Sequence, residues 1–546
     1  MKIKTLPKEI WSEYQKLQEY LTEHNVYETV KTNENFYDGN QWEGVKTENM
    51  PKPVINVLQR VVKYLIATLA SNEVSVSITP FSTNKDDIEK MKPIAQEVEK
   101  VIEQTKLKEA SRIAIRNSAV DGASYMLQSF DANYETGQPL KGRIENTLID
   151  NTNMYFGNPY NNDIQKQPYI IIAMRQYVKQ VKLEAEELGL DEEIISEIRA
   201  DSDSNQVNDN SDCLCTVLLK FYKDRHEITE KHIVVDELGN EIEVEETKTV
   251  KTVWFTKTTE NVTLIKPTDL GYTRYPISCF GWDPMKNSYL YNSPMTAVIP
   301  NQIFINKCFA IAQMYGLQSA FPKIVYDKNK VQIDKFLDGS NHAVVGIDMM
   351  GKFLDFIKVP DFSNNILSLL ESTIQQTKEC MGVNDASLGN VKPDNTSAII
   401  ALQEASNVPL ELQRQAFYVF WEDTVRNILD IMANDYGTRQ VITEVEGQQT
   451  LGTVNYSLLR AINFEVNVDI GNGAQYSEIA QVNTLDKLFQ SQVIDEETYV
   501  TTIPDKYILN KAKIIENVKA RKQQAELAMQ QQMQAQQLLP DQHMIG

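Results

Sequence analysis

One segment has the glycine spacing of a phosphate-binding loop. Gly346, Gly351 and Lys352 stand where such a loop needs its tight turn and its phosphate-contacting ammonium group. The next residue is Phe353, at the position where a serine or threonine hydroxyl would have to hold Mg²⁺. The flanks are typical of a β-hairpin rather than of a strand followed by a helix. We therefore expect no ATP site in this segment.

Other residue types that could do chemistry do not form a site. Cys213 and Cys215 are too close for a usual zinc site, and no second cysteine pair follows them. His226 and His232 lie near that pair, but their spacing is also unsuitable for zinc. Two carboxylate pairs stand where helices are expected to begin, a position that suits the helix dipole. These pairs are Asp86-Asp87 and Glu192-Glu193. The sequence predicts no catalytic residues, no metal and no cofactor, and hence no enzyme.

The order of elements from residue 293 to 437 is more informative. Ser293-Pro294 is typical of a helix start, and the helical pattern continues to Gly316-Leu317. This helix is apolar nearly all round, and such a helix is normally covered by neighbours, either within one chain or from further copies. Its one polar stripe consists of Gln302, Asn306 and Gln313. Strands are expected next, near Lys323–Tyr326 and Ala343–Ile347.

A second helix, a polar loop and a long helix follow. The second helix is expected over residues 361–382, with a full polar face beside its apolar one. Residues 383–395 are rich in turn-forming residues and predict a loop. The pattern from Thr396 to Gly437 predicts one long helix of about 60 Å. Pro409 lies inside this helix and is expected to kink it.

The rest of the chain mixes helical and strand patterns. A single amphipathic helix is expected over Lys8–Thr32, and a more apolar one over Val54–Leu69. The period changes to two between Leu214 and Ile265, which predicts an antiparallel meander. Alternating apolar residues also predict a strand over Phe464–Ile470. The expected fold class is therefore α+β and mainly helical, with antiparallel β segments and a long kinked helix.

This arrangement resembles the portal proteins of tailed bacteriophages, and the resemblance covers nearly the whole chain. Its pieces are individually short, but their order and spacing are specific. The matching pieces are Phe36–Trp42, Pro51–Asn56, Gln302 with Asn306, Gly382-Val383 and Asp394–Ala398. The resemblance implies a portal fold with a wing, a stem, a clip and a crown.

The resemblance also implies a division of the chain into these parts. We expect them as follows: wing, 1–290; first stem helix, 291–317; clip, 318–360; second stem helix, 361–382; tunnel loop, 383–395; long kinked helix and return strand to the wing, 396–473; helical crown with a glutamine-rich tail, 474–546.

Three groups of site residues follow from the same resemblance. The tunnel loop would place next to DNA the residues Asn384, Asp385, Ser387, Leu388, Asn390, Lys392, Asp394 and Asn395. The second stem helix would line the channel with Ser368, Glu371, Gln375 and Lys378. The clip would dock partners through Lys328, Lys330, Lys335 and Lys352.

Composition bounds the possible partners. The chain has 546 residues and a formal net charge of −21, unlike the basic surface of a protein that grips nucleic acid. The acidic balance fits a soluble, self-repelling surface, and it also fits a channel wall along which DNA slides. Five cysteines without framework spacing favour reduced thiols in a cytoplasmic setting. No stretch approaches the roughly 18 apolar residues of a membrane span, so no membrane partner is expected.

The partners expected from the resemblance are those of a portal vertex. The chain would form a homo-oligomeric ring of twelve copies, with double-stranded DNA passing through its channel during packaging, retention and ejection. The ring would dock the terminase and later a head–tail adaptor, and would contact the major capsid and scaffolding proteins. Its location would be the virion, after assembly in the cytoplasm of the host bacterium.

Two alternatives remain open at this point. A terminase large subunit, an ATPase and nuclease, has a similar length but needs a complete phosphate-binding loop and an acidic nuclease cluster. A structural head or tail protein without a DNA channel would not explain a helix, a β module and a helix followed by a loop.

Overall fold

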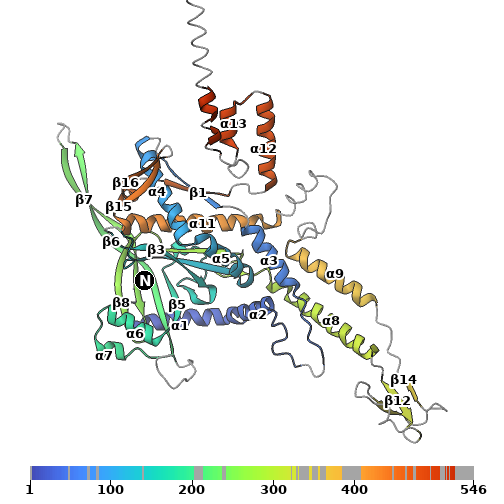
Figure 1. Cartoon of the computed structure of the whole chain (residues 1–546). Helices are drawn as coiled ribbons and strands as arrows, with labels where there is room; N and C mark the ends of the chain where they lie inside the picture. Colours follow the sequence, from blue (N-terminus) through green and yellow to red (C-terminus); the bar gives the residue numbers. More distant parts are fainter. Residues whose placement is uncertain are drawn as a thin grey trace, which may run out of the picture. The chain divides into compact units, whose positions relative to one another are not determined.

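The structure, a computed structural model, divides the chain into two compact units (Figure 1). The larger unit comprises Met1–Ala70 and Ser75–Asp469, and the smaller one Ser71–Val74 and Ile470–Gly546. The described residues are 3–46, 50–70, 74–81, 85–137, 140–201, 213–235, 241–320, 323–327, 330, 343–346, 354–356, 364–383, 408–445, 448–460, 464–470, 475–491, 493–503, 511, 513–515 and 517–522. Helices and strands both contribute, which confirms the α+β class.

The N-terminal helical segment forms two helices, so the single helix expected over Lys8–Thr32 is wrong. Helix α1 spans Pro7–Glu23 and α2 spans Val26–Asp38. Between them Asn25 has a left-handed backbone, with φ of 55°, which interrupts the helical hydrogen bonds and which asparagine tolerates well. The apolar face of α1 is buried as expected. It consists of Ile10, Tyr14, Leu17 and Leu21.

Three further helices complete the N-terminal part. Helix α3 spans Val57–Ala70, α4 spans Lys85–Gln104 and α5 spans Leu107–Asp121. Helix α3 starts three residues later than Val54, the predicted start, because Asn56 caps it: the Asn56 side-chain oxygen accepts a hydrogen bond from the Gln59 amide at 2.9 Å. Two short helices, α6 and α7, lie further along, at Val178–Glu187 and Glu192–Ser196.

Two antiparallel sheets form the β part of the body. One has the strand order β3-β2-β9 and the other β4-β5-β6-β7-β8, which confirms the predicted meander. Their strands are β2 Ala123–Asp131, β3 Arg143–Asp150, β9 Ile277–Gly281, β4 Met154–Phe156, β5 Tyr169–Tyr177, β6 Leu214–Val235, β7 Glu241–Thr258 and β8 Thr263–Tyr272. A short pair, β10 Asp283–Pro284 and β11 Tyr291–Asn292, follows.

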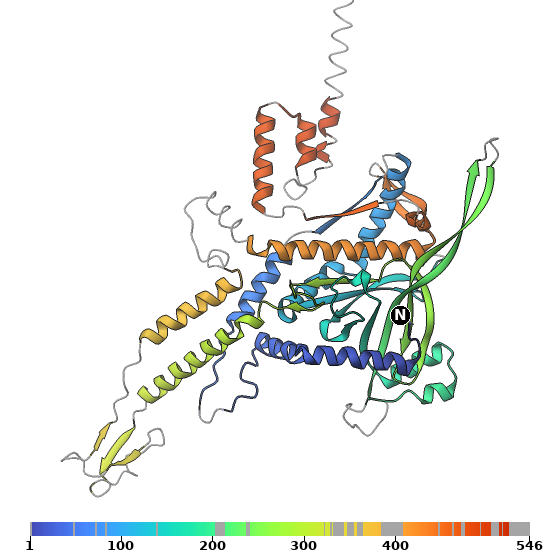
Figure 2. The same ribbon diagram turned by 180° about the vertical axis from the view of Figure 1, so that it is seen from behind.

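Strands β6 and β7 extend well beyond their neighbours in the sheet. Strand β5 pairs with β6 only as far as Tyr222, and β8 pairs with β7 only from Val253 onward. Beyond these points the two strands pair only with each other, and they project as a two-stranded ribbon in both views (Figures 1 and 2).

The first helix in residues 293–437 differs from the expectation at both ends. Helix α8 spans Ile299–Ala320 and follows a 3₁₀ turn, so the predicted start at Ser293-Pro294 is wrong. The Ser293 hydroxyl accepts a hydrogen bond from the Met295 amide and donates one to a carbonyl of α5, and it therefore caps an earlier turn. The helix also continues through Gly316, because this glycine keeps a helical backbone and does not act as a stop.

The β module after α8 is a three-stranded sheet rather than a hairpin. Strands β12 Ile324–Asp327, β13 Ala343–Gly346 and β14 Leu354–Phe356 have the order β13-β12-β14. Strand β12 pairs in parallel with β13 and antiparallel with β14, so the hairpin predicted around Gly346–Lys352 is wrong. The described element after this segment is a strand, whereas a phosphate-binding loop is followed by a helix.

Helix α9 spans Asn364–Cys380 and ends as predicted. Gly382 has φ of +74°, and the Val383 amide donates to the Lys378 carbonyl, which is the usual way for a glycine to end a helix. Helices α8 and α9 lie side by side and lead to the small sheet (Figures 1 and 2).

The long helix predicted from Thr396 is shorter within the described residues. Pro409 belongs to a 3₁₀ turn, and helix α11 begins after it and spans Glu411–Ile431. Proline lacks an amide hydrogen and is tolerated just before or at a helix start, so the predicted kink is replaced by a helix boundary. A π-helical turn, Met432–Tyr436, follows α11. Residues 396–407 lie outside the described part.

Helix α11 packs against the sheet β3-β2-β9. The Phe417 and Phe420 rings lie 5.5 and 6.2 Å from the Phe280 ring of β9. The Thr424 and Ser278 hydroxyl groups are 2.8 Å apart, which adds a buried polar link to the same contact.

A hairpin that the sequence did not predict follows α11. It consists of β15 Thr438–Val445 and β16 Gln448–Asn455. The predicted strand at the end of this segment is confirmed as β17 Phe464–Ile470, which pairs with β1 Val74–Pro80.

A buried ion pair fixes α1 to the five-stranded sheet. The Lys220 ammonium group donates to Glu13 Oε2 at 2.6 Å and to the Lys4 carbonyl at 2.8 Å. It also lies 4.6 Å from the centre of the Tyr169 ring. Lys220 is only 1% exposed, so its charge depends on these partners.

The smaller unit is helical in its described part. Helix α12 spans Gln475–Gln490 and α13 spans Glu496–Thr502. Asp495 caps α13 by accepting the Thr498 amide hydrogen bond at 3.0 Å. The glutamine-rich stretch 523–537 lies outside the described residues. No helix in the described part of the chain is both long and apolar enough to span a bilayer.

Candidate functional site at helices α8 and α9

The root of α8 is held to the body by two buried amide side chains. Gln302 donates to the Ile55 carbonyl at 2.7 Å and accepts from the Val57 amide at 3.1 Å. Asn306 donates to Gln41 Oε1 at 2.6 Å. The Ile55 carbonyl and the Val57 amide, at the entry to α3, thus have hydrogen-bond partners on α8. Both groups lie in the interior, where an unpaired backbone group would be costly.

The two N-terminal pieces of the resemblance meet at the same place. Asn56 and Gln41 both donate to the Phe36 carbonyl, at 2.9 and 2.8 Å. The Trp42 indole donates to the Pro53 carbonyl at 2.9 Å. Sequence reasoning noted these residues without assigning them a contact. The side-chain amides of Gln41, Asn56, Gln302 and Asn306 could have indicated these contacts, because a buried amide requires hydrogen-bonding partners.

Helices α8 and α9 are joined by a small hydrophobic cluster. Ile305 and Cys308 of α8 and Leu370 of α9 are buried together. The apolar side chains packed around them are Val57, Phe304, Phe309, Ile366 and Ile374. The Asn301 amide also donates to the Thr377 hydroxyl at 3.2 Å. Because residues early in α8 meet residues late in α9, the two helices run antiparallel.

The outer surface of this pair is unusually apolar. Ile303, Ile311 and Leu317 of α8 are exposed in the single chain, as are Leu367 and Leu369 of α9. The polar stripe predicted on α8 instead points inward at Gln302 and Asn306. Only its third member, Gln313, is exposed. Besides its buried apolar residues, the helix thus buries two amide side chains and exposes three aliphatic ones, whereas a surface helix normally turns polar side chains to solvent.

The four residues predicted to line a channel lie along one side of α9 at helical spacing. Ser368 and Glu371 are exposed, whereas Gln375 and Lys378 are partly buried. Gln375 donates to Glu379 Oε1 at 3.2 Å, one turn further along.

Most of the other predicted site residues lie outside the described part of the chain. These are Lys328, Lys335, Lys352, Asn384, Asp385, Ser387, Leu388, Asn390, Lys392, Asp394 and Asn395. Of the predicted docking lysines, Lys330 is described. Its ammonium group lies 3.4 Å from Asp327 at the end of β12, and the lysine side chain is about half exposed.

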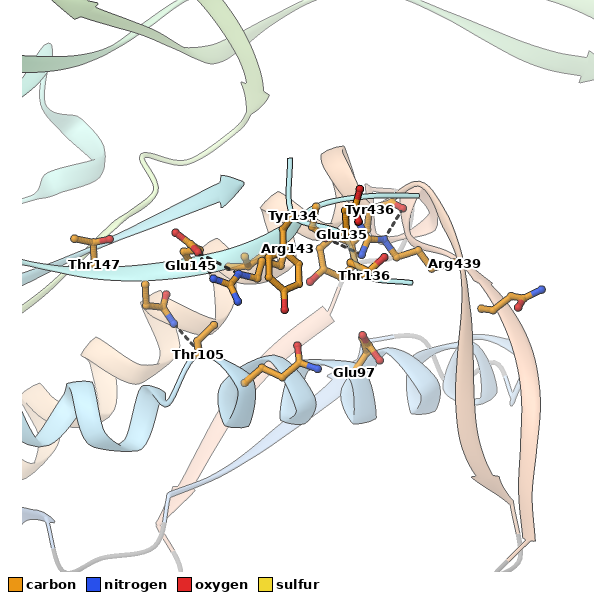
Figure 3. A pocket seen from close by; sticks show the side chains of 15 residues that line it. Glu97, Thr105, Tyr134, Glu135, Thr136, Arg143, Glu145, Thr147, Tyr436 and Arg439 are labelled. Atoms are coloured by element: carbon orange, nitrogen blue, oxygen red, sulfur yellow. Dashed lines mark hydrogen bonds and ion pairs between the residues drawn. The ribbon is translucent and has the colours of Figure 1, made fainter. Parts of the chain in front are cut away.

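A separate cleft of about 660 Å³ lies between α4, β3 and the start of β15 (Figure 3). Two arginines lie against tyrosine rings there. Arg143 lies 3.9 Å from the centre of the Tyr134 ring, and Arg439 lies 3.9 Å from that of Tyr436. Arg143 also forms an ion pair with Glu145 at 2.7 Å.

The hydrogen bonds in this cleft connect two parts of the body. Arg439 is buried, and its guanidinium donates to the carbonyls of Tyr436, Gly142 and Lys141 at 3.0 to 3.2 Å. It thereby ties the β2–β3 connection to the end of α11. None of the described residues that line this cleft is a cysteine, histidine or serine. Across the described residues, no three metal-ligating side chains are grouped to hold an ion.

The structure combines an α+β body with an antiparallel helix pair and a small sheet between the two helices. The chain belongs to the phage P22-like portal protein family, whose model matches residues 14–545. No curated protein matches the sequence at a significant level. The chain is therefore a phage portal protein, and its family is a structural one. Membership in this family implies a capsid-associated ring at a portal vertex.

Proposed function

We propose that copies of this protein form a ring around a channel through which double-stranded DNA enters and leaves the capsid. The observation that carries the proposal is the exposed apolar surface of α8 and α9 together with the family membership. Exposed aliphatic side chains on a projecting helix pair lose contact with water when a neighbouring copy covers them. In this proposal the contact is head-to-tail, and such a contact forms a ring when the rotation between neighbouring copies closes after a full turn.

In this proposal, α9 presents its polar side to the channel. Ser368, Glu371, Gln375 and Lys378 carry one carboxylate and one ammonium group, so the wall has little net attraction for phosphate. DNA slides along such a wall without being held. The loop 383–395 would narrow the channel and bring Lys392 to the phosphates.

The remaining assignments follow the expected division of the chain. The clip, 318–360, is proposed to dock the terminase during packaging and the head–tail adaptor afterward, through Lys328, Lys330, Lys335 and Lys352. The wing, 1–290, and the crown, 474–546, are proposed to face the major capsid protein, the scaffolding protein and the packaged DNA. Twelve copies are the number expected for the ring.

Mass photometry of paired variants tests the ring. Ile311 on α8 is 46% exposed, and Ile113 on α5 is 48% exposed, so they form a matched pair. Ile311→Asp should abolish assemblies and leave the 62.3 kDa species, because it places a charge in the contact between copies. Ile113→Asp should assemble normally. Equal assembly of both variants, or a wild-type protein that stays at 62.3 kDa, would contradict the proposed contact.

A further inference from the structure

Two exposed residues of opposite charge lie at the same level of the helix pair, Lys307 on α8 and Glu371 on α9. The level is fixed by Asn301, whose amide donates to the Thr377 hydroxyl at 3.2 Å. The two helices run antiparallel, and each rises about 1.5 Å per residue. Six residues forward from Asn301 and six residues back from Thr377 therefore reach the same height, and these positions are Lys307 and Glu371.

The next exposed residues on these two surfaces are aliphatic, and they also correspond in level. Four residues further along α8 lies Ile311, and four residues earlier in α9 lies Leu367. Their exposed fractions are 46% and 44%. Each helix thus has a charged and an aliphatic side chain at the same two heights, and the charges on the two helices are opposite in sign.

The two charged residues do not meet within one copy. Lys307 lies two residues after Ile305, which packs against α9, so the lysine lies on the far side of α8. Glu371 lies about 100° round α9 from Leu370, which packs against α8. Because the helices run in opposite directions, these two positions fall on opposite sides of the pair. Neither Lys307 nor Glu371 has an ion-pair partner among the residues that the structure describes.

A head-to-tail contact requires two different surfaces on opposite sides of each copy. In a ring, one side of each helix pair meets the other side of its neighbour. Rotation about an axis that runs along the helices keeps every residue at its own height. Lys307 of one copy therefore comes to the level of Glu371 of the next, and Ile311 comes to the level of Leu367.

We propose, on the basis of the ring proposed above, that Lys307 of each copy forms an ion pair with Glu371 of the next copy. Ile311 and Leu367 form an apolar contact beside it, which loses water and supplies affinity. The ion pair sets the direction of the contact, because a two-fold contact would bring Lys307 of both copies together. Glu371 lies at the margin of the polar side of α9, so the pair leaves the rest of that side to the channel.

Charge reversals followed by mass photometry test this contact on the full chain. Lys307→Glu and Glu371→Lys each place like charges opposite one another at every contact between copies. Each should therefore raise the protein concentration needed for half-maximal ring formation about tenfold or more. The double variant Lys307→Glu/Glu371→Lys should form rings as the wild type does. Glu379→Lys, which reverses an exposed carboxylate elsewhere on α9, is the matched control and should also assemble normally.

A mixture of the two single variants distinguishes a contact between copies from a contact within one copy. In a ring where Lys307→Glu and Glu371→Lys copies alternate, every contact again joins one positive and one negative side chain. Equal amounts of the two variants, each defective alone, should therefore assemble together. Native mass spectrometry should find both variants in the same ring in equal numbers.

Rings that neither single reversal weakens, or defects that neither the double variant nor the mixture repairs, would overturn the ion pair and leave the proposed ring standing. A wild-type protein that forms no ring would overturn both proposals. Both residues are exposed, so the variants should keep the circular dichroism spectrum of the wild type. Should a reversal fail to fold, Lys307→Gln and Glu371→Gln replace it. Each should weaken ring formation by a smaller factor, and assembly equal to that of the wild type would contradict the pair.

Discussion

Lys220 places a charged ammonium group inside the protein, and its neighbours determine the consequences of losing it. Burial lowers the pKa of Lys220, whereas the hydrogen bond and charge of Glu13 counteract that effect. The charged form of Lys220 therefore depends on the Glu13 carboxylate. An ammonium left without its carboxylate would remain in a site closed to water.

Glu13→Ala should lower the free energy of unfolding by about 3–5 kcal/mol, because it leaves Lys220 buried and uncompensated. Urea denaturation followed by circular dichroism measures this change. Glu19→Ala, which removes an exposed carboxylate of the same helix, is the control and should change stability by less than about 0.5 kcal/mol. Similar effects of the two substitutions would show that the ion pair does not hold α1.

Asp121 should make stability depend on pH. Its pKa is about 8 in the folded protein and near 3.8 in the unfolded chain, so the folded state holds the proton over a wider range. The stability from this group is fully present below about pH 4 and is lost as pH rises through 8. Asp121→Asn should flatten that loss in thermal unfolding between pH 5 and 8.5. An unchanged difference in melting temperature across that range would contradict the shifted pKa.

At the residue scale, the sequence identified Gln302 and Asn306 correctly as a polar stripe but not the direction in which it points. Helical spacing indicates which residues share a face. It does not reveal that the partners are backbone groups at Ile55 and Val57, about 250 positions earlier in the chain. The exposure of the aliphatic side chains on α8 could not be predicted either. The sequence pattern of an apolar residue is the same whether its own chain or another copy covers it.

At the element scale, α8 depends on its polar root. Gln302→Ala should leave the Ile55 carbonyl and the Val57 amide without their partner and should cost about 1–3 kcal/mol. Hydrogen exchange of the Val57 amide should speed up accordingly. Gln313→Ala, on the exposed side of the same helix, should leave that exchange unchanged. Equal protection in both variants would show that Gln302 does not hold the root.

Helix and strand positions were predictable, but several boundaries were not. The break at Asn25 depends on one left-handed residue, which a hydrophobic pattern does not reveal. Pro409 was read as a kink, although a proline at a helix start and one inside a helix produce the same local sequence signal. The β15–β16 hairpin was missed because its strands are largely polar, whereas the apolar alternation of β17 made that strand clear.

At the scale of the whole molecule, the loop 383–395 gives a direct test of the channel. Deleting the six residues Asp385–Asn390 should leave ring assembly intact but reduce genome packaging or retention, because the proposed constriction is lost. Phage carrying the deletion would be assayed for genome length and infectivity. Deleting Asp203–Asn208, six residues of a segment rich in Asp, Ser and Asn, is the control of matched length. If phage carrying the first deletion package and retain their genomes normally, the loop is not part of the channel.

The ion pair between Glu13 and Lys220 also has a consequence for the order of events during synthesis. The two residues are 207 positions apart, so a ribosome adding about 5–20 residues per second delivers Lys220 about 10–40 seconds after Glu13. During that interval, α1 has emerged without the ammonium group and the strand β6 that complete its site. Helix α1 is thus translated well before the strand that completes its site, and a chain interrupted before β6 would carry an α1 that it cannot fully bury.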